Sequence, residues 1–285
     1  MFLVRFGELA LKSRFVRRQL RDRLVANIQD LFAAEGVECI TEADEARVYV
    51  HANDQVSARS ILARTFGVVS FSPAIEVHAD LDSLRKPTLS EAADALSPGR
   101  TFALRVRRVG THPFSSQDLA RKLGEDVRAA HPDSRVNLSR PEVEIHIEVR
   151  RNRAFVFREI HPGPGGLPLG SQGRALAVVR DEAGLVAAWM GMKRGCRVTV
   201  ATAGATDLVE PLRKWDVHLK VLGLPQDEEL GGVVRVARAG ALFLGTRWAA
   251  FNPKFHDSLT VPVFEPVIGL ADNEIERIAS RIRTG

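Results

Sequence analysis

Apolar positions in the first quarter of the chain follow two different periods. Between about Lys12 and Ala34, apolar side chains recur at helical spacing, which predicts a long amphipathic helix. Val4–Phe6 before it and a segment around 47–51 after it have the short apolar character of strands. A second helix is predicted near 56–65, followed by an extended segment. The pattern therefore predicts a small domain of mixed helices and strands.

The order of these elements indicates a fold. Strand, helix, strand, strand, helix, strand is the ferredoxin-like order, and we predict such a domain over residues 1–76. A second unit, predicted over 77–168, contains a helix near 89–96 and a strand at Thr101–Arg108 that alternates apolar with basic side chains. Helix 117–130 and two further alternating strands complete this unit, so one face of its sheet is expected to be core and the other basic.

A segment rich in glycine and proline, residues 161–173, is the clearest boundary in the chain. Beyond it we predict strand Ala175–Val179, helix Leu185–Met192 and strand Arg197–Ala201. This alternation is typical of an α/β layer with parallel strands, which we place at residues 169–285. The chain is thus predicted to be a multidomain protein of α+β and α/β type.

Charge is concentrated in two short segments. The net charge is +5 and the isoelectric point about 9.6. Residues 1–23 contain seven basic and two acidic side chains, and residues 100–122 contain six basic and one acidic. Such local clusters favour an anionic partner such as nucleic acid.

Composition otherwise fits a soluble globular chain, with 45% hydrophobic and 26% charged residues. The first residues lack the pattern of a signal peptide, and no apolar run approaches the roughly 18–20 residues of a membrane span. We therefore expect a cytoplasmic protein without a membrane partner. The two cysteines, Cys39 and Cys196, lack neighbours at metal-ligand spacing, so no metal site is predicted.

Two segments are candidates for contact with RNA. Four arginines on the first predicted helix form one stripe, which is either a solvated charged face or an RNA-contacting one. The segment 105–116 adds guanidinium groups for phosphate, rings for stacking or core packing, and a serine at a helix N-terminus. The candidate RNA-binding residues are Lys12, Arg14, Arg17, Arg18, Arg21, Arg105, Arg107, Arg108, His112, Phe114 and Ser115.

These motifs carry a family resemblance that covers nearly the whole chain. Arg105–Ser116 resembles the R-V-K-R-x-G-x-H-x-F-x-S segment of a THUMP domain, an RNA-binding unit. Val4–Lys12 is similar to the V-R-Y-G-E-I-x-L-K opening of tRNA 4-thiouridine synthases, and 262–270 resembles their closing segment. The resemblance implies a ferredoxin-like domain, a THUMP domain and a C-terminal Rossmann-like domain of the PP-loop (adenine nucleotide alpha hydrolase-like) type.

One loop departs from that family. There, an S-G-G-x-D-S turn between strand and helix offers backbone N–H groups to the pyrophosphate of ATP, so that a tRNA uridine is adenylated and then thiolated. This chain has Arg180, Asp181, Glu182 and Ala183 in that turn, followed by Gly184. The two carboxylates either face the polyphosphate region, hold Mg²⁺, or cap the next helix. Shorter archaeal relatives also have an acidic pair there. We therefore treat Arg180, Asp181, Glu182 and Gly184 as a degenerate nucleotide loop and predict no catalytic residue.

The sequence thus favours a tRNA-binding protein of the thiouridine synthase family that lacks ATP-dependent adenylation and needs no cofactor. One alternative is an active tRNA uridine thiolation enzyme that uses ATP with Mg²⁺ at a modified site, helped by a sulfur-donor protein. Another is a scaffold for a different tRNA-modifying enzyme. The expected partner is tRNA, and a homodimer is compatible with all three functions. Cys196, at the start of a strand, is expected to pack rather than to transfer sulfur.

Overall fold

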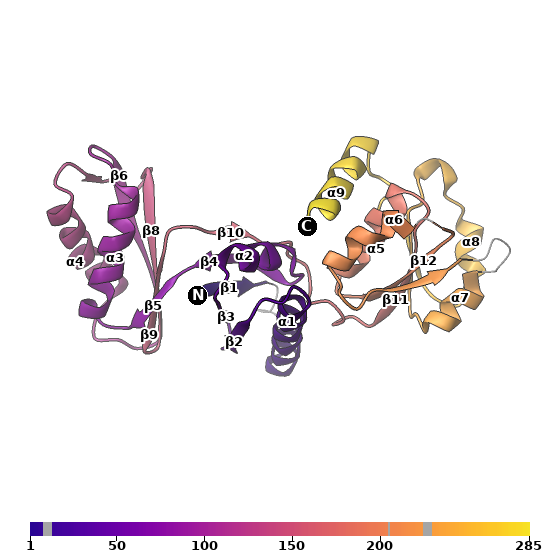
Figure 1. The fold of residues 1–285 in the computed structure, drawn as a ribbon, viewed down its shortest axis with the longest axis horizontal. Coiled ribbons are helices and arrows are strands. Elements are labelled where there is room, and N and C mark those ends of the chain that lie inside the picture. The colour runs from indigo at the N-terminus through magenta and orange to yellow at the C-terminus, as the bar shows by residue number, and fades with distance from the viewer. Residues whose placement is uncertain (8–12, 205, 225–229) are drawn as a thin grey trace. The chain divides into compact units, whose positions relative to one another are not determined.

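The computed structural model describes residues 1–7, 13–204, 206–224 and 230–285. It forms two compact units (Figure 1). One unit consists of residues 1–3 and 71–161, and the other of residues 4–70 and 162–285.

The N-terminal elements alternate as the sequence predicts. They are β1 (Phe2–Phe6), α1 (Arg14–Ala34), β2 (Cys39–Ala43), β3 (Val48–Ala52), α2 (Gln55–Arg64) and β4 (Val68–Pro73). The sheet order is β10-β4-β1-β3-β2, with β10 (His161–Pro162) at one edge. Without that added edge strand this is the strand order of a ferredoxin-like domain, so the predicted fold is confirmed. Lys12 lies outside the described residues.

Local signals fix the ends of α1. The hydroxyl of Ser13 accepts a hydrogen bond from the Val16 backbone N–H (3.3 Å), and the left-handed Gly36 (φ 66°) follows the helix. Leu20, Leu24 and Ile28 are buried along one face. The four arginines Arg14, Arg17, Arg18 and Arg21 form a stripe beside this buried face, where Arg17 and Arg21 are partly exposed.

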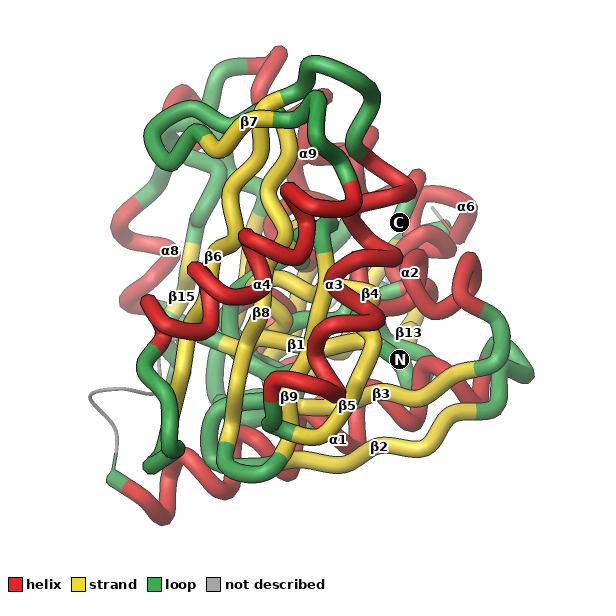
Figure 2. The backbone as a smooth tube through the Cα atoms, turned by 90° about the vertical axis from the view of Figure 1, so that its left-hand side faces the viewer, coloured by secondary structure: helices red, strands yellow, loops and turns green. Residues whose placement is uncertain are grey.

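A second sheet is built from residues 75–157. Its elements are β5 (Ile75–His78), α3 (Leu81–Ala95), β6 (Thr101–Val109), α4 (Ser116–Ala130), β7 (Arg135–Val136), β8 (Val143–Arg150) and β9 (Arg153–Phe157). The strand order is β5-β9-β8-β6-β7, with β6 parallel to β7 and β8, and β9 antiparallel to β8 and β5. Figure 2 shows α3 and α4 side by side over one face of this sheet.

Helix α3 begins eight residues earlier than the sequence pattern indicates. Asp80 caps it by accepting a hydrogen bond from the Ser83 N–H (2.8 Å), and Pro87 lies inside the helix. The sequence predicts the helix only near 89–96, beyond Pro87, and a proline is disfavoured in a helix interior. The cap at Asp80 overrides that preference.

The C-terminal elements form an α/β layer. They are β11 (Arg174–Val178), α5 (Glu182–Lys193), β12 (Arg197–Thr202), α6 (Thr206–Val209), the 3₁₀ turn η1 (Glu210–Lys214), β13 (Lys220–Gly223), α7 (Leu230–Ala237), β14 (Leu242–Leu244), the 3₁₀ turn η2 (Trp248–Ala250), α8 (Pro253–Asp257), β15 (Val263–Phe264) and α9 (Asp272–Thr284). All pairs in the sheet are parallel, in the order β13-β12-β11-β14-β15. The predicted parallel α/β layer is confirmed.

The N-terminal segment 4–70 packs against this layer within one compact unit. The rings of Phe66, Trp189 and Trp215 lie 5.1–5.6 Å apart between centroids. The Asn27 side chain donates to the Leu169 carbonyl (3.1 Å), and the Arg64 Nε donates to the Lys214 carbonyl (3.1 Å). Apolar burial and specific hydrogen bonds together hold the two parts.

Within the described residues, none of the helices combines the length and the apolarity that a membrane-spanning segment requires. The boundaries 1–76, 77–168 and 169–285 for three separate domains stay predictions.

Candidate nucleic-acid interface and nucleotide loop

Strand β6 places its three candidate arginines in different surroundings. Arg105 is paired: its Nε donates to the Glu144 carboxylate (2.8 Å) and its Nη2 to the Leu138 carbonyl (2.9 Å). Arg107 is exposed, and its guanidinium has no bonded partner among the described residues. Arg107 is therefore a cation of this strand that is available to an anionic ligand.

Arg108 is tied to the loop that follows β6. Its Nη1 donates to the Gly110 carbonyl (3.2 Å) and lies 3.4 Å from the His112 Nδ1. Its Nε is buried without a hydrogen-bond partner in the described part of the chain. Gly110 has a φ of 104°, which a residue with a side chain rarely adopts. The backbone here is bent so that Arg108 and His112 face each other.

His112 and Phe114 stack on one another, with centroids 5.4 Å apart and planes inclined by 29°. The His112 Nε2 lies 2.5 Å from the Arg151 carbonyl, at the turn between β8 and β9. Phe114 is partly buried against the core under α3 and α4. For Phe114, the structure therefore favours core packing over an open stacking platform.

Ser115 is the N-cap of α4. Its hydroxyl accepts from the Asp118 N–H (3.1 Å), while the Asp118 carboxylate accepts from the Ser115 N–H (3.2 Å). This reciprocal arrangement is a capping box. Hydrogen bonds from Ser115 hold the pKa of Asp118 below its ordinary value. The Ser115 hydroxyl is thus engaged in the helix end.

A groove of about 470 Å³ runs beside β6. Leu104–Arg107, the first turn of α4 at Ser116 and Gln117, and His146 of β8 line it. β7 pairs with β6 only at Thr101 and Phe102, so the outer edge of β6 beyond Phe102 borders this groove. The Ser115–Asp118 capping box already occupies the α4 N-terminus at this groove. The exposed Arg107 therefore supplies the charge that favours an anion here.

The arginine stripe of α1 forms a second basic surface. Arg14, Arg17, Arg18 and Arg21 line a hollow of about 180 Å³ together with Glu45. Arg18 and Arg21 both lie near Asp22, at 3.6 and 2.7 Å. Arg14 and Arg17 contact no acceptor within the described ranges. The structure therefore gathers the four predicted residues and leaves two of them uncompensated in the part of the chain that it describes.

The turn after β11 separates its two carboxylates. Asp181 is the N-cap of α5 and accepts from the Gly184 N–H (2.8 Å). Glu182 points elsewhere and pairs with Arg283 of α9. Of these two acidic side chains, Asp181 borders the region in front of the α5 N-terminus and Glu182 does not.

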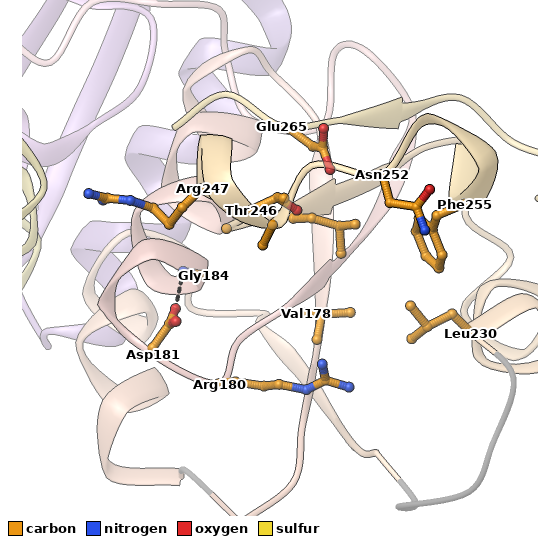
Figure 3. A pocket seen from close by; sticks show the side chains of 13 residues that line it. Val178, Arg180, Asp181, Gly184, Leu230, Thr246, Arg247, Asn252, Phe255 and Glu265 are labelled. Atoms are coloured by element: carbon orange, nitrogen blue, oxygen red, sulfur yellow. Dashed lines mark hydrogen bonds between the residues drawn. The ribbon is translucent and has the colours of Figure 1, made fainter. Parts of the chain in front are cut away.

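That region is a cleft of about 430 Å³ (Figure 3). It lies at the carboxyl ends of β11 and β14, next to the α5 N-terminus, where the order of the parallel strands reverses. Such a reversal is the usual ligand position in open α/β sheets. Arg180 borders the cleft, is exposed, and has no bonded partner in the parts of the chain that are described.

Sequence reasoning missed several residues of the cleft. Thr246, Arg247, Asn252 and Glu265 line it, and Arg247 pairs with Asp272. The Glu265 side chain is 7% exposed and lies 3.4 Å from the His256 Nε2. These residues follow the ends of β14 and β15, so the rule that ligands bind at the carboxyl ends of strands is the signal that could have found them.

Glycine is required where two of the cleft's turns meet. A Cβ atom added to Gly245 would overlap the Gly184 backbone nitrogen. This close approach leaves little room at the helix N-terminus for any larger side chain.

Domain comparisons agree with this architecture. Residues 1–72 match the ThiI ferredoxin-like domain and residues 78–159 match the THUMP domain. The chain is therefore a THUMP-domain protein with a ferredoxin-like domain before the THUMP domain.

Curated relatives of the chain identify its protein family more specifically. The chain is 37% identical over 204 residues to a probable tRNA sulfurtransferase of Methanothermobacter thermautotrophicus, covering 70% of this chain and 51% of the relative. It is 32% identical over 332 residues to the tRNA sulfurtransferase of Pyrobaculum aerophilum, covering 99% of this chain and 66% of that relative. The chain thus spans about half to two thirds of the length of these curated relatives. It is a relative of the tRNA sulfurtransferases, and the predicted resemblance is confirmed.

Solved structures agree on the fold. PH1313 from Pyrococcus horikoshii Ot3 superposes with a TM-score of 0.85 at 26% identity, covering 99% of this chain and 98% of that one. A 4-thiouridine synthetase in complex with RNA and bound ATP superposes with a TM-score of 0.82 at 20% identity, covering 99% of this chain and 84% of that one. At that identity the second likeness shows the fold alone.

Proposed function

We propose that this chain is a tRNA-binding protein related to the tRNA sulfurtransferases that does not itself adenylate tRNA. Its relatives are named for action on tRNA, and a protein of the same fold has been seen with RNA. Arginines without acceptors among the described residues, Arg107 on β6 and Arg14 and Arg17 on α1, supply the phosphate contacts. His112 and Ser115 position the loop that follows β6.

The observation that supports the absence of tRNA adenylation is the Asp181 cap. A phosphate at a helix N-terminus is held by free N–H groups and the positive end of the helix dipole. Here the Asp181 carboxylate already occupies the Gly184 N–H at 2.8 Å. Two unit charges about 4 Å apart repel by roughly 1–4 kcal/mol at effective dielectric constants of 80 to 20. The residues present therefore do not fit the polyphosphate of ATP.

The binding half is tested by filter binding with total tRNA. We expect a dissociation constant of about micromolar order at low salt that rises steeply with salt, because arginine–phosphate contacts release counterions. Replacing Arg105, Arg107 and Arg108 together by alanine should greatly weaken binding. Unchanged binding by the triple variant would remove the β6 surface from the proposal.

The catalytic half is tested by calorimetry with Mg-ATP and by the 4-thiouridine content of tRNA from cells with and without the gene. We expect no ATP binding and equal thiouridine content. The variant Asp181→Asn keeps a good cap while it removes the charge, so it should show measurable ATP binding where the unaltered chain shows none. Glu182→Gln is the matched control, since Glu182 pairs with Arg283 outside the cleft.

The cleft at the strand reversal favours a second candidate, an active thiolation enzyme with a modified nucleotide site. Arg180 and Arg247 both line it and offer guanidinium groups to an anion. In that case Mg-ATP is the cofactor and a partner protein supplies the sulfur. Formation of 4-thiouridine in a reconstituted mixture would select this candidate.

Two simpler measurements address the partners of the chain. Retention of a protein partner without retention of tRNA would point to a scaffold for a different tRNA-modifying enzyme. Sedimentation of the purified chain, alone and with tRNA, would show whether it forms a homodimer.

A further inference from the structure

The turn that follows β14 carries an exposed aromatic pair. The Trp248 side chain is 76% exposed and Phe251 is 40% exposed. Their rings are nearly parallel, with an interplanar angle of 8° and centroids 6.2 Å apart. An indole left this open on a protein surface is a common mark of a binding surface.

This pair belongs to the rim of the cleft. Arg247, Ala250 and Asn252, which flank the two aromatic residues in sequence, all line it. Phe251 packs edge-on against His256, with centroids 5.6 Å apart and planes at 84°. His256 in turn faces the buried Glu265 carboxylate. The Trp248 indole therefore stacks on Phe251, and Phe251 is itself held by its contact with His256.

Cationic side chains accompany the aromatic pair. Arg180 lines the same cleft, and Lys254 is exposed on the same rim segment. Neither has a side-chain partner within the described residues. Flat aromatic faces combined with uncompensated cations are the features by which proteins hold single-stranded nucleic acid, through base stacking and phosphate contacts. Lysine is depleted at protein–protein interfaces, so the exposed Lys254 favours a nucleic-acid occupant over a protein partner.

We propose that Trp248 is a stacking platform for an unpaired base of a single-stranded RNA segment, with Arg180 contacting a phosphate at the mouth of the cleft. This inference rests on the proposed tRNA binding and assigns one of its contact points to the α/β layer. No motif singled out in the sequence points to Trp248.

The tryptophan content makes a direct test possible. Of the three tryptophans, Trp189 and Trp215 are only 4% and 2% exposed, so quenching by acrylamide reports mainly on Trp248. We expect saturating tRNA to quench this emission and to shield it from acrylamide. Trp248→Phe should lose the quenchable signal yet bind tRNA within about threefold of the unaltered chain, because a phenyl ring still stacks.

Trp248→Ala should raise the dissociation constant for tRNA by about 5- to 150-fold, the range expected for the loss of one stacked base. Val236→Ala is the control, since Val236 is 73% exposed on α7 and outside the cleft lining. It should leave binding unchanged.

Three results would overturn the inference. If tRNA binds but Trp248 stays equally accessible to acrylamide, Trp248 does not stack on a base, while the proposed tRNA binding stands. If ATP or uridine monophosphate alone quenches Trp248 as strongly as tRNA does, the occupant is a free nucleotide. If a protein partner shields Trp248 and tRNA does not, the rim is a protein-docking surface. Loss of all tRNA binding by the unaltered chain would instead contradict the proposed function itself.

Discussion

Arg105 and Arg107 stand two positions apart on the same face of β6, yet they offer different charge to a ligand. Arg105 shares its charge with Glu144 and a carbonyl, whereas Arg107 is exposed without an acceptor in the described ranges. A paired guanidinium must give up its partner before it contacts phosphate. A guanidinium without an acceptor meets no such cost.

Arg107→Ala should therefore weaken tRNA binding more than Arg105→Ala. We expect Arg107→Ala to lower the slope of log K against log salt by about 1, because one phosphate contact is lost. Filter binding across a salt series measures the slope. Arg121→Ala serves as a control on the exposed side of α4, where Arg121 pairs with Glu125 (3.5 Å). An equal or larger effect of Arg105→Ala would show that the Glu144 pair opens on binding.

The two thiols give a second prediction at this scale. Burial raises the pKa of both Cys39 and Cys196, and for Cys196 the nearby Arg194 only partly opposes this. A raised pKa leaves less thiolate at a given pH, so both thiols should react with a disulfide reagent more slowly in the folded chain than in guanidinium. Cys39→Ser isolates Cys196. Faster reaction of folded Cys196 would instead mark it as a sulfur-accepting nucleophile.

At the scale of elements, the start of α4 decides how the basic loop is presented. The Ser115–Asp118 capping box anchors the helix, and the stacked His112 and Phe114 precede it. The pKa of Asp118 is lower in the folded chain than its ordinary value, so the ionised Asp118 carboxylate stabilises the fold above the ordinary aspartate pKa. The stabilisation comes from its hydrogen bonds with Ser115. It declines as the pH falls through the depressed value.

Ser115→Ala should lower the free energy of unfolding by about 1 kcal/mol, the usual cost of a lost N-cap. Urea denaturation followed by circular dichroism measures this. Ser115→Asp is the conservative variant and should retain most of the stability. If Ser115→Ala unfolds like the unaltered chain but loses tRNA binding, the hydroxyl contacts RNA rather than capping the helix.

At the scale of the whole molecule, the segment 4–70 and the α/β layer share one unit through a few specific contacts. Arg64 is 4% exposed and donates to the Lys214 carbonyl and the Ser60 hydroxyl, and it pairs with Glu35. This one side chain contacts residues up to 150 positions away in the sequence. Its removal leaves a carbonyl and a carboxylate without their partner.

Arg64→Ala should therefore lower the free energy of unfolding by about 1–3 kcal/mol, because the buried Arg64 side chain loses hydrogen bonds, one of them to a charged partner. Urea titration followed by tryptophan emission reports on it, because Trp189 and Trp215 lie in the adjoining aromatic cluster. Val56→Ala on the same helix is a control, since the Val56 side chain is 79% exposed. A change below about 0.5 kcal/mol for Arg64→Ala would show that the apolar cluster holds the unit alone.

Much of the fold is accessible from the sequence. The helical periods of α1 and α4 and the alternation in β6, β8 and β9 depend on neighbours within one element, so they can be predicted directly. The start of α3 is missed because Pro87, a residue disfavoured inside helices, separates the predicted helix from the cap at Asp80. The roles of Phe114 and Ser115 stay ambiguous in the sequence, since core packing or capping and ligand contact use the same residue types.

The sequence by itself determined the ferredoxin-like order, the THUMP-like basic segment and the replacement of the phosphate loop. These follow from residues close together in the chain. Only the tertiary structure decided that Asp181 holds the α5 N-terminus while Glu182 pairs with Arg283, 101 residues away. It also decided which of the described arginines keep an uncompensated charge and that Trp248 stands open beside the cleft. The physical reason is that a side chain's partner is chosen by whatever the fold brings near it, and local sequence does not contain that information.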